Sequence, residues 1–328
     1  MTLFHNFSAG PSAIPKRVLE QIRSDIPDWD GEGMSVIEAS HRGKKFNKIA
    51  QSAESNLRLL LDVPDNYQIL FVQGGASLQF SMIPLNLSTN HSVVDYAITG
   101  SWGKKAAKEG SRFSNVNIAS DSIHSNYTSI ENEEKWRKSA NADYLHITSN
   151  ETIGGVEYNF IPRAKNIPIV TDMSSSILSR PVDISKYGLI YAGAQKNIGP
   201  AGLTIVIIRE DLIGKARSET PTLLNYKTYS DSNSMYNTPP VFSWYVADLV
   251  FKYLIDIGGL SKIESLNIEK ASLLYEYIDQ SEFYSNPVKK NCRSRMNVPF
   301  LLKDKSKDSE FIKQANCAGL VNLKGHRS

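Results

Sequence analysis

Six short apolar runs, each followed by small or polar residues, constrain the fold of this 328-residue chain most strongly. They read "YQILFV", "HSVVDYAI", "ADYLHIT", "IPIV", "GLIYAGA" and "LTIVII". Near-continuous apolar strands of this kind are buried on both faces, as in a mostly parallel sheet covered by helices. Residues 46–63 and 241–257 carry long helical patterns on either side of these runs. The sequence therefore predicts an α/β fold of three layers with a mostly parallel central sheet.

The length of the chain predicts more than one structural unit, because single hydrophobic cores stop growing at about 250–300 residues. We expect an N-terminal arm at residues 1–14, a large domain at 15–260 and a smaller α+β C-terminal domain at 261–328. Within the small domain, residues 294–302 are typical of a strand and residues 309–319 of a helix.

Composition argues against several classes of protein. A net charge of +3 is too small for a dedicated nucleic-acid binder. Two cysteines, Cys292 and Cys317, form neither a disulfide framework nor a metal-binding spacing. No apolar run is long enough to span a membrane, and the N-terminus lacks the pattern of a secretory signal. We expect a cytoplasmic protein with no metal, no nucleic-acid partner and no membrane partner.

Two charged residues follow neighbouring apolar runs. Asp172 comes after "IPIV" and Lys196 after "GLIYAGA". In open α/β sheets, ligands bind beyond the carboxyl ends of the strands. Taken singly, Asp172 is better explained as a helix cap and Lys196 as a lysine that extends to solvent. Together they favour pyridoxal 5'-phosphate, which needs a lysine amine for a Schiff base and a carboxylate that keeps its ring nitrogen protonated.

Two further motifs fit the same cofactor. Gly74 and Gly75 allow a tight turn, after which Ala76 and Ser77 can open a helix whose backbone N–H groups bind phosphate. Trp102 could lie flat on the pyridine ring, although a partly buried core tryptophan explains it equally well. Each motif alone is weak, because a Gly-Gly turn is more often only a turn.

The chain resembles phosphoserine aminotransferases, pyridoxal-phosphate enzymes of the aspartate-aminotransferase fold type. The similar segments run along the whole chain and include "NFSAGPSAIP", "SHRGKKF", "FVQGGASLQF", "TGSWGKKAAKE", "GLIYAGAQKNIGPAG", "MYNTPPVFSWYV" and "LKGHRS". The resemblance implies amino-group transfer between glutamate and 3-phosphohydroxypyruvate, in serine biosynthesis. Some members also accept 3-hydroxy-2-oxo-4-phosphobutanoate, in pyridoxal phosphate biosynthesis.

The resemblance also implies roles for single residues. Lys196 corresponds to the Schiff-base lysine, Asp172 to the partner of the pyridine nitrogen and Trp102 to the stacking ring. The resemblance implies that four residues contact the cofactor phosphate and ring oxygen, namely Ala76, Ser77, Thr152 and Gln195. Asn237 and Thr238 are implied to reach the phosphate from a second subunit, so the family implies a homodimer with shared active sites.

Two His-Arg pairs, His41-Arg42 and His326-Arg327, are implied to bind the anionic groups of the substrate. Alone, each pair is better explained as a solvated surface patch. In the family the final segment continues for about thirty residues and carries an arginine for the substrate α-carboxylate, so we expect the natural chain to extend past Ser328. If it does not, a catalytically impaired cofactor-binding protein is the alternative.

Rival functions find less support in the sequence. A nicotinamide oxidoreductase needs G-x-G-x-x-G after an early strand, and neither "QGGASLQ" nor "GSWGKKAAKEG" has that spacing. A cysteine desulfurase needs a mobile nucleophilic cysteine, whereas both cysteines lie late in the chain, in or beside regular elements. Another pyridoxal-phosphate transaminase of the same fold type stays open.

Overall fold

The computed structural model describes residues 4–164 and 166–325. Its centre is a seven-stranded sheet in the order β2-β10-β9-β8-β5-β3-β4. Only β10 runs antiparallel to its neighbours, so the prediction of a mostly parallel sheet is confirmed. The seven strands are β2 (Tyr67–Gln73), β3 (Val93–Ile98), β4 (Asn115–Asp121), β5 (Ala142–Thr148), β8 (Ile169–Asp172), β9 (Leu189–Gly193) and β10 (Leu203–Arg209).

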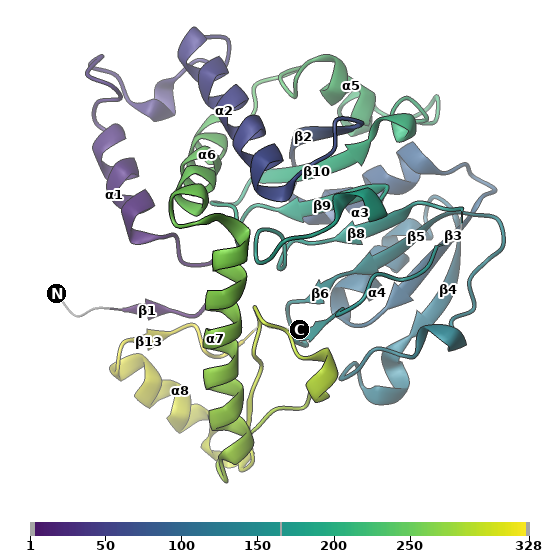
Figure 1. Cartoon of the computed structure of the whole chain (residues 1–328), viewed down its shortest axis with the longest axis vertical. Helices are drawn as coiled ribbons and strands as arrows, with labels where there is room; N and C mark the ends of the chain where they lie inside the picture. The colour runs from purple at the N-terminus through teal and green to yellow at the C-terminus, as the bar shows by residue number, and fades with distance from the viewer. Residues whose placement is uncertain (1–3, 165, 326–328) are drawn as a thin grey trace.

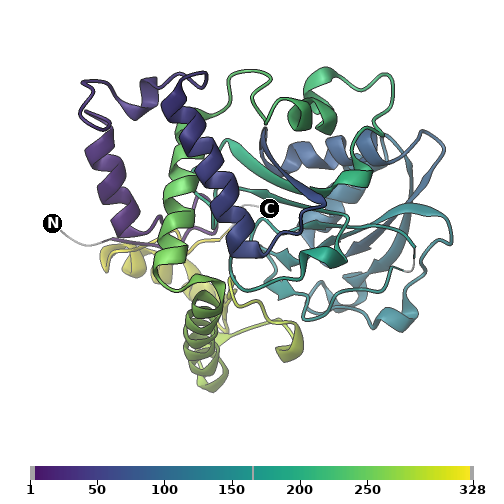
Figure 2. The same cartoon turned by 45° about the horizontal axis from the view of Figure 1, so that its top comes forward.

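Helices cover both faces of this sheet, which gives the three predicted layers (Figures 1 and 2). On one face, α1 (Lys16–Asp25), α2 (Lys44–Leu61) and α6 (Val241–Asp256) share one hydrophobic core with the sheet. On the other face, α3 (Gly75–Leu87), α4 (Ser101–Gly110) and α5 (Tyr226–Asp231) share a second core. Pro15 occupies the N-cap position of α1.

The alternation of side chains in β10 explains why its sequence is apolar throughout. Ile205 and Ile207 belong to the core under α2 and α6, while Val206 and Ile208 belong to the core under α3. Successive side chains of a strand point to opposite faces, and both faces are covered here. A strand in this position has no face that can be polar.

The C-terminal part of the chain packs beside the sheet domain. The long helix α7 (Gly259–Gln280) follows α6, and α8 (Asp308–Cys317) comes after it near the end of the chain (Figure 1). Short strands complete this part, namely β11 (Tyr284–Ser285), β12 (Leu301–Leu302) and β13 (Leu320–Val321). The N-terminal arm contributes β1 (His5–Asn6), which pairs parallel with β13. The predicted boundary at residue 260 lies in the first turn of α7 and stays a prediction.

Two elements differ from the sequence-based expectation. The strand predicted at residues 294–302 is reduced to β12, since the Ser294 hydroxyl accepts hydrogen bonds from the backbone N–H groups of Met296 and Asn297, and Pro299 has no N–H to donate. β4 was not predicted. Its sequence, "NVNIASD", is polar because it forms the edge of the sheet and buries fewer side chains.

Candidate active site

A cavity of about 420 Å³ opens where the parallel strands of the sheet end. Seven residues that the sequence analysis singled out line it together: Ala76, Ser77, Trp102, Thr152, Asp172, Gln195 and Lys196. They come from the starts of α3 and α4, from the ends of β8 and β9 and from the loop after β6 (Asn150–Glu151). The chain therefore assembles the predicted strand-end residues around one hollow.

Lys196 lies three residues past the end of β9. Its Nζ donates a hydrogen bond to Oγ1 of Thr152 at 2.5 Å and lies 5.8 Å from the centroid of the Trp102 ring. Burial lowers the pKa of Lys196, while the carboxylates of Asp172 and Glu151 partly oppose that shift. Because its pKa is lowered, a larger fraction of the amine is neutral and nucleophilic at neutral pH.

The N-terminal arm holds the backbone at this lysine. The Ser12 hydroxyl donates a hydrogen bond to the carbonyl of Lys196, and Gly10 and Pro11 line the cavity. A Cβ on Gly10 would lie 3.1 Å from Cγ of Lys196, so the arm approaches the lysine side chain closely. The arm is thus part of the site as well as a connection to β13.

Asp172 ends β8 on the neighbouring strand, and its side chain is only 5% exposed. Its Oδ1 accepts a hydrogen bond from the backbone N–H of Ser174 at 2.8 Å. Burial raises the pKa of Asp172, while the charge of Lys196 and hydrogen bonds from Ser174 and Tyr191 act in the opposite direction. The hydroxyl oxygen of Tyr191 lies 2.8 Å from Nε2 of the buried His146. Asp172, Tyr191 and His146 are therefore linked by successive hydrogen bonds.

The start of α3 forms the end of the cavity that suits a phosphate. Gly74 precedes the helix with a φ of 95° and Gly75 follows with a φ of 70°, which favours glycine at both positions. The α3 helix has thirteen residues and no acidic side chain in its first turn. Ala76 and Ser77 line the cavity in this first turn, where a helix leaves backbone N–H groups without an intrahelical partner and its dipole is positive.

Glu151 was given no role in the sequence analysis, although it stands between two residues that line the cavity. It is fully buried, and it accepts hydrogen bonds from the backbone N–H groups of Trp102 and Gly103 at 3.0 and 2.8 Å. Burial raises the pKa of Glu151 to about 7. The only sequence signal for it was an acidic residue directly after a buried strand.

The structure does not bring every predicted residue to the cavity. Asn237 and Thr238 lie beside the end of β2, where Nε2 of Gln73 donates to the Thr238 carbonyl at 2.9 Å. His41 and Arg42 lie in the turn before α2, and Arg42 is exposed. None of these four lines the cavity of its own chain. His326 and Arg327 lie outside the described residues.

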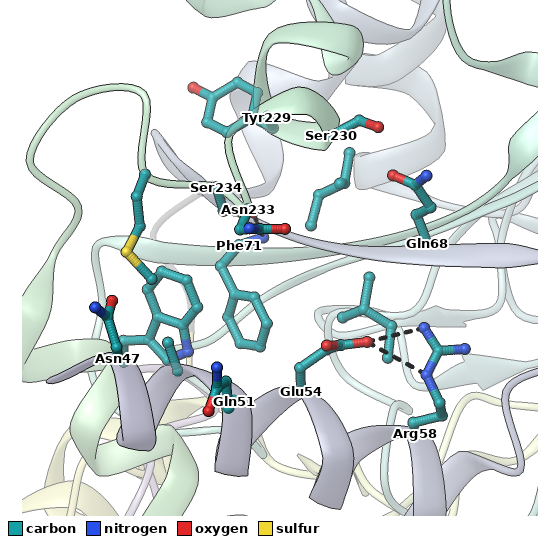
Figure 3. Close-up of a pocket in the computed structure, with 15 residues that line it drawn as sticks. Asn47, Gln51, Glu54, Arg58, Gln68, Phe71, Tyr229, Ser230, Asn233 and Ser234 are labelled. Atoms are coloured by element: carbon teal, nitrogen blue, oxygen red, sulfur yellow. Dashed lines mark hydrogen bonds and ion pairs between the residues drawn. The ribbon is translucent and has the colours of Figure 1, made fainter. Parts of the chain in front are cut away.

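A larger cavity of about 570 Å³ lies at the β2 edge of the sheet, between α2 and the segment after α5 (Figure 3). Its two charged side chains, Glu54 and Arg58, are already paired with each other at 2.9 Å. It contains none of the residues that the sequence analysis singled out. We therefore assign the chemistry to the smaller cavity.

The smaller cavity fits pyridoxal phosphate. It offers an amine with a lowered pKa, a buried carboxylate, an aromatic ring and a helix start within one hollow. Two buried side-chain oxygens on its wall, Oγ1 of Thr148 and Oδ1 of Asn150, have no hydrogen-bond partner within the described residues. Across the same residues, no group of three His, Cys, Asp or Glu side chains could hold a metal ion. No described helix is long and apolar enough to cross a membrane.

Comparison with known proteins places this site in a family. Residues 4–327 match the model of the class-V aminotransferases. The chain is 54% identical to the phosphoserine aminotransferase of Pseudomonas entomophila, over 98% of this chain and 90% of that protein. It is 55% identical to the enzyme of the same name from Acidithiobacillus ferrooxidans, over the whole of this chain and 90% of that protein.

Solved structures agree with the sequence comparison. The phosphoserine aminotransferase of Bacillus circulans subsp. alkalophilus superposes with a TM-score of 0.95 at 44% identity, over 98% of this chain and 89% of that one. The enzyme from Trichomonas vaginalis, solved with pyridoxal phosphate bound, gives 0.94 at 42% identity, over 98% and 92% of the two chains. The predicted resemblance is confirmed, and this chain belongs to the class-V aminotransferase family.

Proposed function

We propose that this protein catalyses reversible amino-group transfer between L-glutamate and 3-phosphohydroxypyruvate, giving O-phospho-L-serine and 2-oxoglutarate. The observation that carries the proposal is the cavity in which Lys196 and Asp172 lie at the ends of adjacent strands. The relatives at 54% and 55% identity, all phosphoserine aminotransferases, support the choice of substrates.

When bound, pyridoxal phosphate withdraws electrons from the substrate Cα, so that an amino group can leave one molecule and enter another. In this proposal Asp172 holds a proton at the ring nitrogen of the cofactor. The N–H groups of Ala76 and Ser77 would bind its phosphate, and Gln195, which lines the same cavity, would contribute a further contact to the cofactor. The indole of Trp102 packs on the ring and excludes water from one of its faces.

Lys196 provides the amine that binds the cofactor and that moves a proton at the substrate Cα. Its hydrogen bond to Oγ1 of Thr152 holds Nζ against another residue that lines the cavity. Because burial lowers its pKa, a larger fraction of Nζ is neutral and able to accept a proton, as a general base must be.

We propose a homodimer with shared active sites, and the residues that stay outside the cavity support it. Thr238 is exposed, and its neighbour Tyr236 is 55% exposed. We propose that Asn237 and Thr238 contact the cofactor phosphate in the second copy of the chain. Mixing a Lys196→Ala protein with a Thr238→Ala, Asn237→Ala protein tests this, because one intact site forms in each mixed dimer. If mixing restores no turnover, the sites are not shared.

Substrate anions are the proposed ligands of His41 and Arg42. The guanidinium of arginine matches a phosphate or carboxylate bidentately. Since Arg42 lies outside the cavity of its own chain, it would have to reach the cavity of the second copy. The pair His326-Arg327 is proposed for the same task.

The few cysteines, neither of them disulfide-bonded, support a cytoplasmic location.

A turnover assay with glutamate and 3-phosphohydroxypyruvate tests the function. We expect phosphoserine to form, and we expect oxaloacetate in place of the phosphorylated acid to give a much lower rate. Equal rates with the two acceptors would indicate a transaminase with another preferred substrate.

The rival cysteine desulfurase finds no support, because Cys292 is buried, Cys317 lies on α8, and neither lines the cavity.

A further inference from the structure

The side chain of Glu151 leaves β6 and ends at the first turn of α4, about fifty residues earlier in the chain. Oε2 accepts the backbone N–H of Trp102 at 3.0 Å, and Oε1 accepts that of Gly103 at 2.8 Å. These donors are among those that a helix start leaves without an intrahelical partner. The residue at the cap position of α4 is Gly100, which has no side chain to satisfy them. Glu151 therefore caps this helix from another element.

The local backbone is built around this carboxylate. A Cβ on Gly100 would lie 2.5 Å from Cδ and 2.7 Å from Oε2 of Glu151, so any larger residue at position 100 would displace the carboxylate. A Cβ on Gly103 would lie 3.4 Å from Oε1. The space that Glu151 occupies at the start of α4 therefore depends on glycine at position 100.

The carboxylate of Glu151 holds the first turn of α4, which carries Trp102. Nζ of Lys196 lies 5.8 Å from the centroid of this indole, and Nζ of Lys105 lies 4.5 Å from it. The backbone N–H of Trp102 is itself one of the two donors to Glu151. A shift of that N–H would move the indole relative to Lys196 and to anything bound between them.

We propose that Glu151 is a positioning residue that sets the place of the Trp102 indole over the cofactor ring, through its two backbone hydrogen bonds at the start of α4. The proposal rests on the proposed function only for the identity of the ring that Trp102 covers. Glu151 itself does not line the cavity. Its proposed effect on cofactor affinity passes through Trp102, while its charge also acts on Lys196, so most of the effect should be lost when the indole is absent.

A double-mutant cycle on the full chain tests this coupling. The dissociation constant of pyridoxal phosphate is measured by equilibrium dialysis against the apoprotein, for wild type, Glu151→Ala, Trp102→Ala and the double variant. We expect Glu151→Ala to raise the dissociation constant about tenfold, the size typical of lost hydrogen bonds to a carboxylate. In the Trp102→Ala background the same change should have an effect of less than about twofold. Equal fold-changes in both backgrounds would overturn the proposal.

A matched control separates positioning from general destabilisation. Glu157 is also a buried carboxylate, 6% exposed, and it accepts a backbone N–H from Arg295 at 2.8 Å outside the cavity. Glu157→Ala should lower the thermal midpoint of the apoprotein without changing the dissociation constant. If it weakens cofactor binding as much as Glu151→Ala does, Glu151 has no special role.

Two further readouts keep the test decisive. If Glu151→Ala does not fold, Glu151→Gln keeps one acceptor oxygen, and it should give a dissociation constant between wild type and Trp102→Ala, with a weaker induced circular dichroism of the cofactor band. A wild-type value and a wild-type spectrum would overturn the proposal. Failure of the proposed function looks different, since wild type would then bind the cofactor without producing phosphoserine.

Discussion

Replacing Glu151 with glutamine should change how the stability of the apoprotein depends on pH. Burial raises the pKa of Glu151 from 4.5 to about 7 in the folded chain, with Asp172 raising it further and Lys196 opposing. The folded state therefore holds a proton that the unfolded state has lost between these two values. The stability that Glu151 contributes is complete below pH 4.5 and is lost as the pH rises through 7.

The size of this effect follows from the two pKa values. Each pKa unit corresponds to about 1.4 kcal/mol, so the wild-type apoprotein should lose about 2.5 kcal/mol of unfolding free energy from Glu151 alone between pH 5 and pH 8. Glutamine does not titrate, so Glu151→Gln lacks this loss. Its amide also gives up one hydrogen-bond acceptor, but that penalty is the same at both pH values.

Urea unfolding of the two apoproteins side by side, at pH 5 and pH 8, measures the difference. We expect the stability of Glu151→Gln relative to wild type to rise by about 2.5 kcal/mol from the lower to the higher pH. Comparing the two proteins at each pH cancels the titration of all other groups. A relative stability that is the same at both pH values would refute the argument that burial raises this pKa.

Three other substitutions test separate parts of the site. Asp172→Asn should keep the fold and cut turnover at least about tenfold, since a charge-assisted hydrogen bond contributes about 1.5–3 kcal/mol; near-normal steady-state rates would leave Asp172 only the role of accepting the N–H of Ser174 in the turn after β8. Arg42→Ala should raise the Michaelis constants for both glutamate and the phosphorylated acid while cofactor content stays unchanged, and unaltered constants would refute the role. Gly100→Ala should destabilise the protein by about 1–3 kcal/mol through overpacking against Glu151, whereas Gly154→Ala, whose Cβ would lie 3.6 Å from the nearest atom, should be nearly neutral in thermal unfolding. Equal midpoints for the two glycine variants would contradict the clash.

Much of the cavity was predictable because parallel strands bring their carboxyl ends to one edge of a sheet. Asp172 and Lys196 follow adjacent strands. Two apolar runs, each followed by a charged residue, were therefore enough to predict that the two side chains lie close together. The glycine turn before Ala76 was predictable for a similar reason, since strand, turn and helix are contiguous in sequence. The long apolar runs predicted the buried strands because both faces of the sheet are covered.

Contacts between distant segments could not be predicted in this way. Glu151 meets α4 across about fifty residues, and no periodicity in the sequence relates an acidic residue on β6 to the backbone N–H groups at the start of α4. The prediction of a strand at residues 294–302 was wrong over most of its length for a local reason, because the side chain of Ser294 competes for backbone hydrogen bonds. The edge strand β4 was missed because hydrophobic patterns report burial, and an edge strand is only partly buried.

The covalent attachment site of the cofactor tests the central claim most directly. The purified protein is loaded with pyridoxal phosphate, reduced with borohydride, digested and mapped by mass spectrometry. Lys196 is the lysine that lines the cavity beside Asp172, so we expect the reduced label on the peptide that contains Lys196 and none in a Lys196→Ala protein. Recovery of the label on a different lysine, or full labelling of the Lys196→Ala protein, would contradict the assignment of this cavity as the active site.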